Sequence, residues 1–204
     1  MTSRLPRSVA ALVAGCAAVA LAGCLHAPGP PTAGAARGFV PDLRGTPVMV
    51  LPVQSRPGVP GDPEAELVFA LTQRGPGVRW LMPATLRAEL ARSPMLDVPL
   101  EQLPVDVFLR VQVNRIGDPL FGYLKRLSAI SGGRLALIPV EVRHRAATKD
   151  RPGAIEVVAT LIDVDGGRVT WFGVVQGTAG EASNPAALAS AADALARVLL
   201  PAGA

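Results

Sequence analysis

The stretch that decides the fold is 154-AIEVVATLIDVDGGRVTWFGVVQG-177. Its two ends, residues 154–164 and 168–177, are runs of apolar and β-branched residues, which are typical of β-strands. The sequence 165-DGG-167 separates them, and glycine readily adopts the positive φ angles that tight hairpin turns require. The stretch therefore predicts a β-hairpin of two strands.

A helix is predicted to close the chain after this hairpin. Asn184 is a favourable N-cap, and Pro185 fits the first position of a helix. Apolar residues then recur at helical spacing, which predicts a stripe that packs against the sheet. The stripe consists of Leu188, Ala191, Leu195 and Val198.

Strands and helices alternate in the sequence before the hairpin. The strict alternation of 105-VDVFLRVQV-113 makes it the clearest strand of this part. Pro139 predicts that the following strand is an edge strand or carries a bulge. Residues 119–133 fit either a short helix or a mobile excursion. Strands are expected at 46–53, 78–82, 105–113 and 134–144, and helices at 63–74 and 83–93.

This order predicts one α/β domain over residues 46–204. We expect a mixed sheet of about six strands with helices packed on it, a late antiparallel meander and a closing C-terminal helix. Residues 24–45 are rich in Pro, Gly and Ala and have no apolar period, so they are interpreted as a flexible tether. Residues 1–23 have the layout of a secretory signal peptide, with a basic start and a short apolar run.

The end of that signal, 21-LAGC-24, is similar to the lipobox of bacterial lipoproteins. The resemblance implies cleavage between Gly23 and Cys24 and attachment of diacylglycerol to the Cys24 thiol. Cys16, after 13-VAG-15, fits the same pattern but leaves a shorter apolar run before it. A retained transmembrane anchor and two ordinary apolar helix cysteines are the alternatives. The 14-residue run from Val9 to Ala22 is short for a span, which needs roughly 20 residues.

Composition excludes several other classes of function. The net charge is +4, and without Arg4 and Arg7 of the signal it is +2. Charges of both signs are scattered, with no basic block interleaved with aromatics, so no nucleic-acid partner is expected. No phosphate-binding glycine motif occurs, and we expect no cofactor and no metal.

The sequence yields no catalytic residue, and we expect the protein not to be an enzyme. Asp163 and Asp165 resemble the start of a calcium loop, but the remaining ligands are missing, so they are interpreted as turn residues. His144 is interpreted as a hydrogen-bonded or exposed residue near a strand end. The rival hypothesis, a lipid-tethered periplasmic hydrolase or ligand-binding protein, requires His144, Asp163 and a serine in one cleft.

Aromatic residues are the candidates for partner contact. Trp171 and Phe172 point to opposite sides of the last strand, so one is expected in the core and the other partly exposed. An exposed aromatic side chain can anchor a protein partner. The candidate partner-binding residues are Phe121, Tyr123 and Trp171.

The domain resembles several envelope lipoprotein families. These are the amino-terminal domain of TolB, the curli-secretion lipoprotein CsgG, the polysaccharide-export lipoprotein PelC and the synthase activator LpoB. The resemblance rests on an opening strand at Val48–Pro52 and on a late pattern of spaced residues, and it spans roughly residues 46–200. The pattern consists of Leu161, Asp163, Gly167, Val169 and Trp171.

This resemblance implies a periplasmic α/β domain that contacts other proteins and has no active site. Residues 119–133 are too short for the membrane hairpins of a curli-type pore, and no propeller follows, so a pore or a whole TolB is not expected. We therefore predict a lipid-anchored adaptor or assembly factor of the cell envelope. Its partners would be the membrane and an unidentified envelope protein, and homo-oligomerisation stays open. Leu25 rather than Asp after the lipid site is typical of outer-membrane sorting in enteric bacteria.

Overall fold

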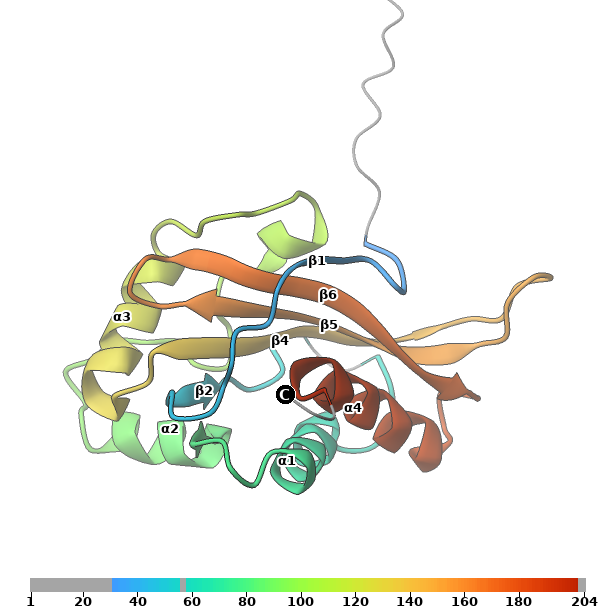
Figure 1. Ribbon diagram of the computed structural model, residues 1–204, viewed down its shortest axis with the longest axis horizontal. Helices are drawn as coiled ribbons and strands as arrows, with labels where there is room; N and C mark the ends of the chain where they lie inside the picture. The colour runs from blue at the N-terminus through green and yellow to red at the C-terminus, as the bar shows by residue number, and fades with distance from the viewer. Residues whose placement is uncertain (1–30, 56–57, 202–204) are drawn as a thin grey trace, which may run out of the picture.

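The computed structural model describes residues 31–55 and 58–201, and Figure 1 shows their arrangement. A six-stranded mixed sheet has the order β1-β6-β5-β4-β2-β3, and the C-terminal helix closes the domain. The predicted fold class is therefore confirmed. The strands are β1 (Ala36–Gly38), β2 (Val48–Val50), β3 (Trp80–Leu81), β4 (Leu135–Arg145), β5 (Ala154–Asp163) and β6 (Arg168–Ala179). The α-helices are α1 (Pro63–Arg74), α2 (Pro83–Ala91), α3 (Leu120–Ser131) and α4 (Pro185–Leu199), and a 3-10 helix, η1, spans Asp106–Leu109.

The predicted hairpin is the antiparallel pair β5–β6, and in the sheet β6 lies between β1 and β5. Of its two turn glycines, Gly167 takes the positive φ, 64°. β4 pairs with β5 along its whole length, and the register shifts between Pro139 and Glu141. Because β4 lies between β5 and β2, it is not an edge strand. Of the two predicted alternatives for Pro139, the bulge is therefore the correct one.

Helices cover both faces of the sheet, and each face has its own apolar core. α1 and α4 lie together on one face, as Figure 1 shows below the strands. Asp62 caps α1 and Asn184 caps α4 through side-chain hydrogen bonds to backbone N–H groups. The other face is covered by α2, α3 and the segment that joins them. Within the described part of the chain, no helix has the length and apolarity needed to cross a bilayer.

The predicted strand at 105–113 is wrong, because this segment forms η1 and a loop. Val105 and Phe108 are buried, whereas Val107 and Val111 are 41% and 47% exposed. Buried residues three positions apart fit the three-residue turn of a 3-10 helix. Phe108 stacks on Phe172 of β6 with ring centroids 6.4 Å apart, so this contact replaces strand pairing.

Residues 119–133 form helix α3 rather than a mobile excursion. Leu124 and Leu127 of α3 are fully buried against the second core. Gly132 ends the helix in the left-handed conformation with φ of 73°. The helix is therefore part of the folded domain.

The predicted tether at 24–45 extends too far, because its second half belongs to the sheet. β1 pairs antiparallel with β6 at Ala36, Arg37 and Gly38, and Leu43 is only 2% exposed. A side chain at Gly38 would clash with the backbone of Thr170, since its Cβ would lie 2.1 Å from the carbonyl oxygen. The signal peptide, Gly23 and Cys24 lie outside the described residues.

Candidate functional site

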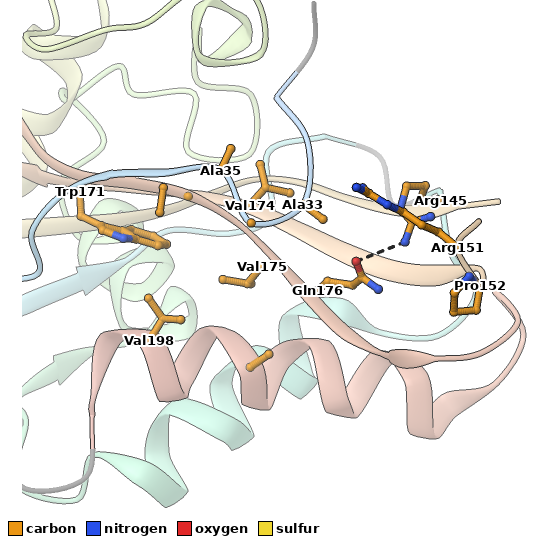
Figure 2. A pocket seen from close by; sticks show the side chains of 14 residues that line it. Ala33, Ala35, Arg145, Arg151, Pro152, Trp171, Val174, Val175, Gln176 and Val198 are labelled. Atoms are coloured by element: carbon orange, nitrogen blue, oxygen red, sulfur yellow. Dashed lines mark hydrogen bonds between the residues drawn. The ribbon is translucent and has the colours of Figure 1, made fainter. Parts of the chain in front are cut away.

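A groove of about 600 Å³ lies along the outer edge of β6, between residues 33–36 and helix α4 (Figure 2). One part is apolar, and the other part carries arginine and glutamine side chains. Figure 2 shows Trp171 at the apolar end, Val198 on α4 beneath it, and Arg145 and Arg151 at the opposite end. We call this feature the β6 groove. Its remaining lining residues are Ala33, Gly34, Ala35, Ala36, Pro152, Gly173, Val174, Val175, Gln176 and Ala194.

The groove exists because β1 is much shorter than β6. β1 pairs with β6 only from Trp171 to Gly173, and hydrogen bonds from Gly34 and to Ala35 extend this contact to Val174. Before this contact, Arg115 forms an antiparallel bridge with Arg168, and beyond it the Thr178 N–H donates to Ser190 Oγ at 2.8 Å. The stretch of β6 between Val174 and Thr178 therefore has no neighbouring strand among the described residues. Unpaired sheet edges are templates for the addition of another strand.

The apolar end depends on a glycine next to the tryptophan. A Cβ on Gly173 would lie 2.4 Å from the Trp171 ring, so only glycine lets the indole lie along the strand. Trp171 is 4% exposed, whereas Val198 is 40% exposed. The predicted stripe on α4 is therefore correct for its first three members, but Val198 lies at the groove and Leu199 takes the buried position.

The polar end is held by a buried carboxylate. Glu156 of β5 is 1% exposed and accepts hydrogen bonds from Nε of Arg143 at 3.1 Å and from Nε of Arg145 at 2.7 Å. Arg145 also donates from Nη2 to the side-chain oxygen of Gln176 at 3.2 Å, the dashed line in Figure 2. This network fixes Arg145 at the groove.

The polar end favours an acidic ligand. Arg145 Nη1 is buried and has no hydrogen-bond partner among the described residues. Arg151 is exposed beside it, and no Asp or Glu lines the groove. A free guanidinium donor next to a second arginine is suited to a carboxylate.

The structure does not bring the three aromatic candidates together. Trp171 lines the β6 groove, whereas Phe121 and Tyr123 are half-buried against the core on the other face of the sheet. The Arg126 guanidinium lies 5.5 Å from the centre of the Tyr123 ring. The expectation that Trp171 or Phe172 is partly exposed is wrong, since both are 4% exposed.

The residues of the rival hypothesis lie far apart. His144 pairs with Ile155 at one end of the β4–β5 ladder, and Asp163 pairs with Leu135 at the other end. The His144 Nε2 lies 3.1 Å from the carbonyl oxygen of Gly180, so it is hydrogen-bonded at a strand end. Asp163 accepts a hydrogen bond from the backbone of Asp165 within the turn. Across residues 31–55 and 58–201, no three His, Cys, Asp or Glu side chains form a group that could hold a metal.

Sequence reasoning missed the arginines of the groove. A signal was present, because Glu156 is the only charged residue inside the apolar run of β5 before its end. A lone carboxylate in a buried strand needs a cation nearby. The alternation of β4 then offers Arg143 and Arg145 on one face.

The fold and groove define an α/β domain with a groove beside a short stretch of β6 that has no neighbouring strand among the described residues. The chain is similar to PelC from Paraburkholderia phytofirmans, which was solved as a dodecamer. The two sequences are 18% identical, the match covers 82% of this chain and 95% of PelC, and the TM-score is 0.38. It is also similar to lipoprotein GNA1162 from Neisseria meningitidis, with 14% identity, 78% and 99% covered, and a TM-score of 0.39. No protein-family model and no curated protein matches the chain.

Proposed function

We propose that the protein is a non-enzymatic, lipid-anchored accessory protein of the bacterial cell envelope that binds another protein through the β6 groove. Acyl chains on Cys24 would hold it on the membrane, with the domain facing the periplasm. The observation that carries the binding function is the short open stretch of the β6 edge between Val174 and Thr178, beside an apolar surface and two arginines.

The chemistry of the groove specifies the partner segment. An extended segment can bind the short open stretch of β6 between Val174 and Thr178 through main-chain hydrogen bonds, and its side chains supply the other contacts. An apolar side chain of that segment would contact Trp171 and Val198, and an acidic side chain would bind Arg145 and Arg151. The segment can belong to another envelope protein or to a second copy of this chain.

Affinity capture from membranes tests the groove. We expect Val198→Asp, which puts a charge on the apolar wall, and Arg151→Glu, which reverses the polar end, to lose the captured partner. Met95→Asp is the matched control, because Met95 is 94% exposed and lies outside the groove. All three variants should keep the thermal stability of the wild type. A partner that the groove variants retain would refute this binding site, and capture of another copy would identify a homo-oligomer.

A fatty-acid label tests the anchor separately. Cys24→Ser should lose the label, and Cys16→Ser should keep it, because the LAGC box ends at Cys24. The opposite pattern would move the lipid site to Cys16. Separation of inner and outer membranes on a density gradient tests the proposed outer-membrane location, which rests on Leu25.

A further inference from the structure

Arg37 of β1 borders a second cavity, on the face of the sheet that carries α3. The cavity has a volume of about 350 Å³ and lies between the start of the described chain and the loop after η1. The Arg37 guanidinium carbon lies 4.6 Å from the centre of the Phe172 ring, which itself stacks on Phe108. This sandwich holds the guanidinium plane over an aromatic wall. The other lining residues include Thr32, Arg110 and Gln112.

One edge of the Arg37 guanidinium has no hydrogen-bond partner. Nε and Nη2 are both buried, and neither bonds to any described residue. These two nitrogens point to the same side of the guanidinium, and such a pair donates two parallel hydrogen bonds to a carboxylate or a phosphate. Burial lowers the pKa of Arg37 from its ordinary value, because the charged form loses hydration.

The walls of this cavity favour an anion. No Asp or Glu lines it, whereas Arg37 and Arg110 both do. The nearest acidic partner of Arg110 is Asp106, at 3.9 Å, and both side chains are largely exposed, so the pair neutralises Arg110 weakly. The Gln112 amide and the Thr32 hydroxyl are further donors among the lining residues.

We propose that this cavity binds a phosphate group, with Nε and Nη2 of Arg37 as the bidentate donors. The phosphate can come from free inorganic phosphate or from the headgroup of an anionic phospholipid. Gln112 and Thr32 supply donors for the oxygens that the Arg37 edge does not reach. The site lies on the face opposite α4, and its walls share Ala35 and Ala36 with the β6 groove.

The test is a titration of the purified full-length protein with inorganic phosphate at constant ionic strength, followed by calorimetry and by the NMR signal of the Arg37 Nε–H group. We expect saturable binding and a shift of that signal, which is identified by its loss in Arg37→Lys. Both Arg37→Gln and Arg37→Lys should weaken binding at least about tenfold, because each removes the two-donor edge. Arg79→Gln is the control of equal charge change, since Arg79 is exposed next to β3 at the opposite edge of the sheet.

A second arm identifies the source of the phosphate. Short-chain phosphatidylglycerol and phosphatidylcholine are each titrated as dissolved monomers. Arg37-dependent binding of phosphatidylglycerol that is tighter than that of inorganic phosphate identifies a lipid headgroup, and the reverse order identifies a free anion. Arg37→Lys keeps the charge and the contact with Phe172, so it carries the test if Arg37→Gln unfolds. Equal binding by wild type and Arg37→Lys, or no shift of the Nε–H signal with either ligand, would overturn the proposal.

Discussion

Glu156 is the residue whose substitution tests the structure most directly. Glu156→Gln keeps the size of the side chain but removes the charge that faces Arg143 and Arg145. Loss of one partner from a buried ion pair costs about 3–5 kcal/mol. The two arginines are about a quarter exposed, with 25% and 24% of their side-chain surface accessible, so water partly compensates them. We therefore expect a loss of about 3 kcal/mol in the free energy of unfolding.

Urea unfolding at pH 7, followed by circular dichroism, measures this loss. For a chain of this size, about 3 kcal/mol corresponds to a fall in Tm of roughly 6–12 °C. Glu141→Gln is the matched control, because Glu141 binds Arg143 alone and its side chain is 26% exposed. We expect the control to cost about 1 kcal/mol or less. A Glu156→Gln protein within about 0.5 kcal/mol of wild type would refute the reasoning.

Three further changes test other parts of the fold. Gly177→Ala should lower the free energy of unfolding by about 1–3 kcal/mol, because the new Cβ would lie 2.5–2.9 Å from atoms of α4. Gly77→Ala is the control and should leave the unfolding midpoint unchanged, because its Cβ would have no atom within 4 Å. Leu124→Ala should cost about 2–5 kcal/mol in urea unfolding because Leu124 is fully buried, and a cost below about 1 kcal/mol would favour a mobile excursion over α3. The pKa of Asp193 is lowered by the hydrogen bond from Arg74 of α1 and by nearby positive charge. The folded-state pKa lies below the unfolded value, so the charged form of Asp193 stabilises the fold at neutral pH, and Asp193→Asn should cost about 1 kcal/mol or less there. This cost should vanish as the pH falls below about 4 and Asp193 becomes protonated. A cost that does not change with pH would contradict this prediction.

Local sequence signals predicted the parts of the fold that neighbouring residues determine. The β5–β6 hairpin follows from two apolar runs around a glycine turn, and α4 follows from its cap, its proline and its stripe. Both depend on residues within one element or one turn. Pro139 predicted either an edge strand or a bulge, because proline lacks the N–H that the ladder needs, and the structure shows the bulge.

Long-range pairing explains why other parts could not be predicted. Ala36–Gly38 has neither β-branched residues nor an apolar alternation, and it becomes a strand only because the edge of β6 offers hydrogen-bond partners. The segment at 105–113 alternates like a strand, but Phe108 stacks on Phe172, which lies 64 positions away in the sequence. The β6 groove combines residues of β1, β4, β6 and α4, so no single stretch reveals it.

The short strand β1 also changes how the anchored domain would search its surroundings. A tether of residues 24–45 could extend about 75 Å. Only seven positions separate Cys24 from Pro31, and the carbonyl oxygen of Pro31 accepts a hydrogen bond from Arg143 Nη2 at 2.6 Å. Those seven positions span at most about 25 Å. Effective concentration falls roughly as the −3/2 power of the length of a flexible tether, so a tether about threefold shorter raises the effective concentration of the anchored domain near its anchor about fivefold. With the proposed lipid anchor on Cys24, the pairing of three residues at a sheet edge would favour partners that lie close to that anchor.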